Sequence, residues 1–361
     1  MILINPFKAL RPKKNKAFKI STPSPRYFNI SKSYSKYGYL KILTSKNLKN
    51  SKKYFESMKN KKLIIKDNKD CYYIYKISNK KHSQIGILGR IDLKMYDDKN
   101  ILGHEETFKK RVNERKKQIL NISTQIGPIY SAYKYNKNLN NFLSNLVKSK
   151  PIYSFRSLDK FLHQVWTVNK NENLKKLIKK IKKIYICDGH HRMQGMIKSK
   201  KKISPIVVAF PHNQIKILDY NRVVKSSLNN DQILKIISKN FKIKKIKNNF
   251  SRIKKGFFNM YMNNQWYSLN YLKNNKKLDV KILHESILNK IKVKKIDYIS
   301  GLKNSNFLKN KVNSKKFNLA FKLCPTNIES VMKIADKKNF MPPKSTWFHP
   351  KPLDGLISLE F

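Results

Sequence analysis

The sequence has few cysteines and no long apolar run. Its three cysteines, Cys71, Cys187 and Cys324, are far apart, and no C-x-x-C pair occurs among the 361 residues. This excludes a zinc ribbon and a disulfide framework as the basis of the fold. No run of about 18 apolar residues occurs, so no transmembrane helix is expected, and the opening M-I-L-I-N-P lacks the apolar region of a secretory signal. We therefore expect a cytoplasmic protein without a membrane partner.

Acidic residues are also scarce, with 21 Asp and Glu against 80 Lys and Arg and a net charge of +59. Such a charge is typical of nucleic-acid-binding proteins. However, nine of the 80 are Arg, leaving 71 Lys, and the forked Arg side chain is the one that recognises base edges. Lys, Asn, Ile, Tyr and Phe are all abundant, while Gly and Ala are rare. A genomic bias toward A/T-rich codons explains the whole pattern, so a specific nucleic-acid partner is not expected.

Strands, hairpins and helices alternate without an internal repeat. Residues 71–77, 84–93 and 203–211 are rich in β-branched and aromatic residues, which is typical of strands. Leucine and isoleucine recur at helical spacing over residues 172–183. Similar patterns predict strands at 127–133, 184–187, 215–224 and 317–323, a hairpin with an N-N turn at 257–269, and helices at 105–122, 229–239, 278–291 and 326–336, the last capped by Thr326. This mixture predicts an α+β protein with mixed β-sheets flanked by helices.

No clean linker divides the chain. We expect an N-terminal α/β part, residues 1–214, and a C-terminal α+β part, residues 215–361, and a single compact unit remains an alternative. The number of copies in the assembly is left open.

The strongest functional signal is I-Y-I-C-D-G-H-H-R, where a short apolar strand ends at Asp188, Gly189, His190, His191 and Arg192. A helix that begins there presents free backbone N–H groups and partial positive charge to an anion. The glycine lets the backbone approach a ligand, the arginine forks onto phosphate or carboxylate, and the aspartate caps the helix, accepts a proton or holds a metal. Consecutive side chains diverge, so both histidines cannot easily bind one metal. The alternative is a capped helix with two half-buried histidines.

Two further segments carry polar clusters. In G-H-E-E-T, His104 and Glu105 form a usable acid–base pair. Thr107 or Glu105 could bind the first amides of a helix. The alternative is an ordinary charged helix start. In M-P-P-K-S-T-W-F-H-P-K, three successive side chains, Lys344, Ser345 and Thr346, can bind phosphate, although the segment is not a P-loop and an anchoring loop is the alternative.

Together these motifs resemble the bacterial and archaeal family of domain of unknown function 1015. The chain has N-P-F-K-A-L-R-P, H-E-E-T, C-D-G-H-H-R, L-D-Y-N-R-V-V, L-D-V-K-I-L-H-E, I-D-Y-I-S-G and M-P-P-K-S-T-W-F-H-P-K in the family's order. The family's D-G-H-H-R core is similar to the superfamily of ParB partition proteins, sulfiredoxins and free-serine kinases. The resemblance therefore implies a ParB/sulfiredoxin-like core.

The resemblance also implies a nucleotide-dependent phosphotransferase that uses ATP or ADP with Mg²⁺ and acts on a small molecule, with free L-serine as a specific candidate. It implies that Asp188, His190, His191 and Arg192 contact nucleotide phosphates or the metal, and that His104 and Glu105 are candidates for the general base or metal support. Gly189 and Thr107 would lie beside the nucleotide. Lys344, Ser345 and Thr346 would complete the phosphate pocket.

The sequence departs from the family pattern at two positions. Phe28 stands where the family's early motif has an acid, and Cys187 stands where Ala is usual. The second departure argues against a general catalytic thiol, although a helix N-terminus beside Cys187 could lower its pKa.

Two other functions remain open at this stage. A ParB-like protein that binds DNA in response to nucleotide predicts a steep salt dependence. A zinc-assisted hydrolase that uses His104 with His190 or His191 predicts tightly bound zinc. We expect no dedicated metal-ligand set in the chain itself.

Overall fold

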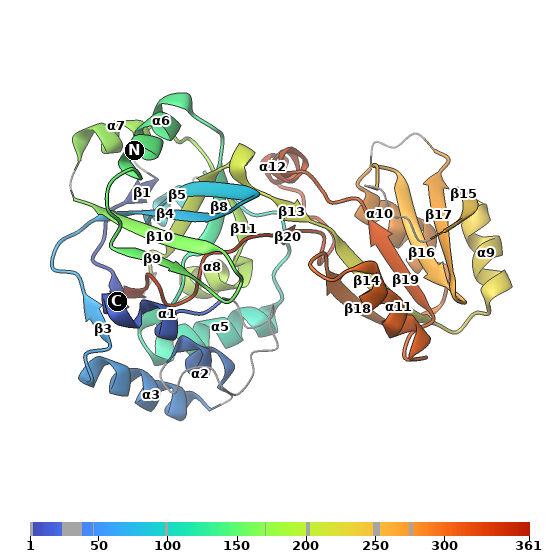
Figure 1. Cartoon of the computed structure of the whole chain (residues 1–361), viewed down its shortest axis with the longest axis horizontal. Coiled ribbons are helices and arrows are strands. Elements are labelled where there is room, and N and C mark those ends of the chain that lie inside the picture. The colour runs from blue at the N-terminus through green and yellow to red at the C-terminus, as the bar shows by residue number, and fades with distance from the viewer. Residues whose placement is uncertain are drawn as a thin grey trace. The chain divides into compact units, whose positions relative to one another are not determined.

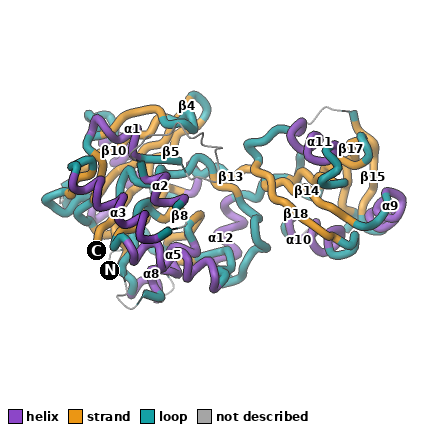
Figure 2. The backbone as a smooth tube through the Cα atoms, turned by 90° about the horizontal axis from the view of Figure 1, so that it is seen from below, coloured by secondary structure: helices purple, strands orange, loops and turns teal. Residues whose placement is uncertain are grey.

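The computed structural model describes residues 3–23, 38–45, 47–97, 100–169, 171–199, 203–247, 253–273 and 277–361 and has a mixed α+β fold, as the sequence predicts (Figures 1 and 2). It divides into two compact units. The first unit contains Met1–Ile215, Ile334–Asn339 and Pro350–Phe361, and the second contains Lys216–Lys333 and Phe340–His349. The chain leaves the first unit at residue 215, near the expected division at 214, but its last twelve residues return to the first unit.

The first unit is built on a mixed sheet, in which nine strands lie within the described residues. Most neighbours are antiparallel, whereas β11 runs parallel to β6 and β12 runs parallel to β8. Across the sheet the order is β6 (Ile101–Leu102), β11 (Ile184–Asp188), β8 (Ile129–Tyr133), β12 (Ile206–Pro211), β5 (His82–Ile91), β4 (Tyr72–Asn79), β10 (Leu162–Val168) and β9 (Tyr153–Arg156), with β1 (Ile4–Asn5) also paired to β5. Two short ribbons pair β2 (Leu10–Pro12) with β3 (Ile64–Lys66) and β7 (Thr124–Gln125) with β21 (Leu359–Glu360).

Helices cover this sheet with their apolar stripes. Leu139 and Leu143 of α6 and Leu174 and Ile178 of α7 are buried against sheet residues such as Ile184. Figure 1 shows α6 and α7 above the strands and α2, α3 and α5 below them. The bounds are η1 (Lys14–Lys16), α1 (Ala17–Ile20), α2 (Tyr39–Thr44), α3 (Leu48–Asn60), α4 (Lys94–Asp97), α5 (Lys109–Asn121), α6 (Lys137–Leu146), α7 (Glu172–Ile178), α8 (His190–Ile197) and η2 (His212–Gln214).

The second unit is built on an antiparallel sheet, in which six strands lie within the described residues. Val223 and Val224 are both fully buried, because successive side chains of a strand point to opposite faces and both faces are covered. The elements are β15 (Phe241–Ile246), β17 (Gln265–Tyr271), β16 (Phe257–Met262), β19 (Leu319–Leu323), β14 (Tyr220–Ser226) and β18 (Val293–Ser300) across the sheet, the helices α9 (Asn230–Ser238), α10 (Asp279–Leu283) and α11 (Ser305–Asn313), the π-helical turn η3 (His284–Leu288), and the pair β13 (Ile217–Leu218) with β20 (Trp347–Phe348). Helix α12 (Ile328–Asp336) begins in the second unit and ends in the first.

The local predictions are confirmed in kind and corrected in detail. Asn263 and Asn264 both have positive φ, which confirms the N-N hairpin turn. The strand predicted over 215–224 is interrupted at residue 219, between β13 and β14. The cap of α12 is Asn327, whose Oδ1 accepts the Ser330 N–H at 2.8 Å, so the prediction of Thr326 was one residue early.

Candidate functional site

Strand β11 delivers the D-G-H-H-R segment at its carboxyl end. Asp188 is the last strand residue, and Gly189 is the N-cap of α8 with φ +103°, a left-handed conformation that disfavours any side chain. Because the N-cap residue is a glycine, it has no side chain that could cap the helix. The first turn, His190 to Arg192, therefore presents the backbone amides that the sequence predicted as an anion site.

His190 is buried against His104, with 6% and 2% of these residues exposed. The His104 backbone N–H donates to His190 Nε2 at 3.3 Å, so that nitrogen carries no proton, and the two rings meet edge to face. His104 Nδ1 lies 2.9 Å from the Ile186 carbonyl and must donate to it. Burial lowers the pKa of His104 to about 4, and burial together with His104 lowers the pKa of His190 well below its usual value. Both rings are therefore neutral at pH 7.

His191 points elsewhere, as expected for consecutive residues of a turn. Its Nε2 accepts the N–H of Phe108 at 3.2 Å, and the two rings stack. Phe108 is the N-cap of α5, which begins at Lys109, so Thr107 precedes the cap position rather than occupying it. Glu105 lies nearer the site, with Oε2 4.0 Å from His190 Nδ1. The structure thus brings the H-E-E-T and D-G-H-H-R motifs together within the first unit.

Asp188 forms an ion pair with Lys351, from the C-terminal segment of the first unit. Partial desolvation by itself favours the protonated acid, but the Lys351 ammonium outweighs it and, with Arg192 and His190, lowers the pKa of Asp188 to about 2. The Asp188 side chain keeps 42% of its surface exposed. An ionised carboxylate and its paired cation therefore lie at the N-terminus of helix α8.

Arg192 reaches a second carboxylate. Its Nη1 donates to the Gly127 carbonyl at 2.6 Å and lies 3.4 Å from Asp354 Oδ1. Burial raises the pKa of Asp354, and Asp188 adds to this effect, while Arg192 and Arg115 oppose it. The site therefore contains two carboxylates whose pKa values are shifted in opposite directions.

Sequence analysis missed Lys351, Asp354 and Gly127. Lys351 closes the quoted segment M-P-P-K-S-T-W-F-H-P-K, so the signal was present, but nothing in the spacing distinguished it from the other lysines. Asp354 follows that segment and is one of only 21 acids in a strongly basic chain. The scarcity of acids was the available signal for it.

Lys344, Ser345 and Thr346 belong to the second unit. Lys344 has φ +60° and its carbonyl accepts from Arg222 Nη2 at 3.3 Å. Ser345 is buried, and its hydroxyl donates to the Pro342 carbonyl at 2.5 Å. These contacts hold the loop in shape, and phosphate binding by the three residues stays a prediction. Phe28 lies outside the described residues.

The structure also bears on the thiol and the zinc site that the sequence left open. Cys187 is buried, and burial raises the pKa of its thiol well above the usual value, so the neighbouring helix N-terminus does not activate this thiol. Within the part of the chain that the structure describes, no group of three or more His, Cys, Asp or Glu is arranged to hold a metal ion. The zinc-assisted hydrolase thus has no ligand set among those residues.

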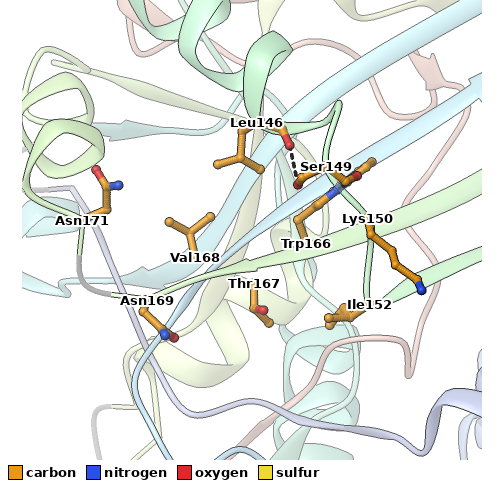
Figure 3. A pocket seen from close by; sticks show the side chains of 9 residues that line it. All are labelled: Leu146, Ser149, Lys150, Ile152, Trp166, Thr167, Val168, Asn169 and Asn171. Atoms are coloured by element: carbon orange, nitrogen blue, oxygen red, sulfur yellow. Dashed lines mark hydrogen bonds between the residues drawn. The ribbon is translucent and has the colours of Figure 1, made fainter.

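A separate hollow of about 330 Å³ lies in the first unit, between the end of α6, strand β10 and the start of α7 (Figure 3). Its wall includes Trp166, whose Nε1 donates to the Ser149 carbonyl at 2.8 Å. Asn171 on its rim uses its side chain to cap α7. These two side chains are thus committed to the fold, and the hollow is lined by none of the predicted site residues.

Of the helices in the described ranges, none is long and apolar enough to cross a bilayer. No curated protein sequence matches the chain.

Solved structures show a distant similarity of fold. They include a free serine kinase in complex with AMP, which is 14% identical, covers 75% of this chain and 91% of its own, and has a TM-score of 0.39. A C-terminally truncated SbnI from Staphylococcus aureus is 12% identical over 73% of this chain and 82% of its own, with a TM-score of 0.42. A conserved hypothetical protein from Pyrococcus furiosus is 12% identical over 74% and 94%, with a TM-score of 0.38. At these scores the similarity carries no conclusion about activity.

The family model gives the stronger result. It spans residues 4–297, which include the N-P-F-K-A-L-R-P, H-E-E-T, D-G-H-H-R and L-D-Y-N-R-V-V segments. The chain therefore belongs to the family described as "Protein of unknown function (DUF1015)".

Proposed function

We propose that this protein is a nucleotide-dependent phosphotransferase that passes a phosphoryl group to the hydroxyl of a small molecule, with free L-serine as the first candidate. One observation carries the proposal. The uncapped first turn of α8 stands in one cluster with two cations, Arg192 and Lys351. Backbone amides, a guanidinium and an ammonium are the groups that bind nucleotide phosphates in proteins.

The charges in this cluster suit phosphoryl transfer, in which most of the catalysis comes from positioning and from neutralising charge. Gly189 lets the backbone come close to the phosphates because it carries no side chain at φ +103°. Arg192 is already oriented by the Gly127 carbonyl, which reduces the entropy lost when it binds an anion. ATP or ADP is the expected donor, and Mg²⁺, bound to its phosphates, would neutralise further charge.

The buried histidines support the site rather than react in it. His190 and His104 are neutral and hold each other through a backbone hydrogen bond, which fixes the start of α8 against Gly103–Glu105. A base with a pKa of about 4 is weak at neutral pH, and His104 Nδ1 already donates to the Ile186 carbonyl, so His104 is a poor candidate for general base. Thr107 remains a proposed nucleotide contact.

An activity assay tests the proposal. Purified protein is incubated with Mg²⁺, L-serine and, in turn, ATP, ADP and pyrophosphate, and phosphoserine is measured by mass spectrometry. We expect phosphoserine with one donor and a loss of at least 100-fold in Arg192→Gln, because the variant lacks the guanidinium that neutralises the phosphates. Arg156→Gln is the matched control, since Arg156 is an exposed arginine of the same unit outside the site.

Thermal unfolding with nucleotide gives an independent readout. Because the net charge of +59 attracts any polyanion, tripolyphosphate at equal concentration serves as the reference. Protection by ATP or ADP beyond that of tripolyphosphate, lost in Arg192→Gln but kept in Arg156→Gln, supports nucleotide binding. If neither phosphoserine nor specific protection is found, the proposed function is wrong. Nucleotide-dependent DNA binding would favour the ParB-like alternative instead.

A further inference from the structure

The two carboxylates of the site have different partners. Asp188 is neutralised directly by Lys351. Among the residues that the structure describes, the cation that contacts the Asp354 carboxylate is Arg192, whose Nη1 lies 3.4 Å from Oδ1 and donates a shorter hydrogen bond of 2.6 Å to the Gly127 carbonyl. The Asp354 side chain is 16% exposed, so one part of it is open to solvent. Of the two, Asp354 is therefore the carboxylate that can receive a proton without first losing a strong ion pair.

The backbone around Asp354 is held on several sides. Asp354 exchanges two backbone hydrogen bonds of 2.9 Å with Thr22, and the next residue, Gly355, donates to the Ile126 carbonyl at 2.9 Å. On its other side, the Leu353 N–H donates to the Tyr75 hydroxyl at 3.1 Å. The same Tyr75 hydroxyl is hydrogen-bonded to Nδ1 of the buried His163 at 2.8 Å. The other ring nitrogen of His163, Nε2, lies 3.1 Å from Asp159 Oδ2. These hydrogen bonds hold the backbone from which the Asp354 side chain projects.

Gly127 makes room for the Asp354 carboxylate. A Cβ at position 127 would lie 2.1 Å from Asp354 Oδ1 and 3.2 Å from Arg192 Nη1. The absence of a side chain there lets the carboxylate, the guanidinium and the Gly127 carbonyl meet. Three charged side chains act on Asp354. Arg192 and Arg115 favour its ionised form, and Asp188 opposes it.

We propose that Asp354 is the proton acceptor of the phosphotransfer reaction. The inference rests on the proposed function. In the step, the acceptor hydroxyl oxygen forms a bond to the transferred phosphorus while the bond from that phosphorus to the nucleotide oxygen breaks. The hydroxyl proton moves to an Asp354 oxygen and then to water. Arg192, which contacts Asp354, belongs to the first turn of α8, so the proposed base lies next to the proposed phosphate site.

The raised pKa of Asp354 supports this assignment. A general base is more effective when its pKa approaches the working pH, and Asp354 is shifted in that direction while Asp188 is shifted away from it. If Asp354 served only to hold Arg192, a permanently ionised carboxylate would be sufficient. The burial of Asp354 disfavours the ionised form and therefore does not suit that role.

The test compares Asp354→Asn with Asp92→Asn, a matched change outside the site at a carboxylate that accepts the Lys94 N–H. Asparagine keeps the shape and the oxygen that accepts from Arg192 but cannot take up a proton. We expect kcat to fall at least 100-fold in Asp354→Asn, nucleotide affinity to stay within threefold, and the acidic limb of the pH–rate profile to disappear. Asp92→Asn should behave as the unmodified protein.

Three results would overturn the inference. If Asp354→Asn retains its rate within threefold, Asp354 is not the base. If it loses nucleotide affinity as much as rate, Asp354 only holds Arg192. If its acidic limb is unchanged, another group takes the proton. A failure of the proposed function looks different, because then the unmodified protein itself forms no phosphorylated product from any donor.

Discussion

Lys351 and Asp188, which are 163 positions apart in the chain, form a direct ion pair at the start of helix α8. Replacing Lys351 with Met should return the pKa of Asp188 from about 2 toward its ordinary value of 3.8. It should also weaken nucleotide binding about tenfold, or about 1.4 kcal/mol, because the phosphates would then meet an unneutralised carboxylate. Calorimetric titration measures the affinity, with the exposed Lys80→Met as control. Equal affinity in the two variants would contradict this role.

Gly127 and Asp354 should be coupled in stability. Gly127→Ala places a methyl group 2.1 Å from Asp354 Oδ1, and the strain should cost roughly 1–3 kcal/mol in the free energy of unfolding. The double variant Gly127→Ala with Asp354→Ala removes the opposing oxygen, so it should be less destabilised than the sum of the single changes. Urea unfolding of the four proteins gives the coupling energy. Simple additivity would show that the alanine is accommodated elsewhere.

The buried histidines predict a stability that falls in mild acid. In the unfolded chain His104 and His190 take up protons near pH 6.5, whereas in the folded protein the pKa of His104 is lowered to about 4 and that of His190 is lowered well below its usual value. The unfolded state therefore binds more protons, and the free energy of unfolding falls as pH drops from about 6.5 toward 4, by up to about 1.4 kcal/mol per pH unit for each histidine.

Urea unfolding between pH 7 and pH 4.5 checks whether the free energy of unfolding falls as the pH drops. The slope of the free energy of unfolding against pH should decrease by the equivalent of one proton in His190→Gln. It should stay unchanged in the control His82→Gln, since His82 is a histidine of the same unit at the end of a hairpin. An unchanged slope in His190→Gln would mean that His190 is protonated in the folded protein.

The thiols should differ sharply in reactivity. Cys71 and Cys187 are buried and burial raises the pKa of both, whereas Cys324 is partly exposed. In the folded protein at pH 8 a thiol reagent should therefore label Cys324 first, and the other two should react only on unfolding. Mass spectrometry of the labelled peptides gives the order. Rapid labelling of Cys187 would revive a nucleophilic role for it.

Local structure was largely predictable because it depends on near neighbours. The strand before Asp188, the turn at Gly189 and the helix that follows all come from one short segment, and so does the divergence of His190 and His191. The N-N turn at Asn263 and Asn264 is fixed in the same way, since few residues adopt positive φ readily. The same local pattern predicts the turn at the start of α8 that we propose as an anion site.

Long-range pairing was decided only by the tertiary structure. Ion pairing and burial depend on which segments the fold brings together, and periodicity does not encode a partner 163 positions away. The sequence by itself therefore determined the α+β class, the family motifs and the amides at the start of α8. Only the return of residues 350–361 to the first unit placed Lys351 beside Asp188 and Asp354 beside Arg192. Because each carboxylate takes its pKa from its spatial neighbours, the difference between the two acids exists only in the folded chain.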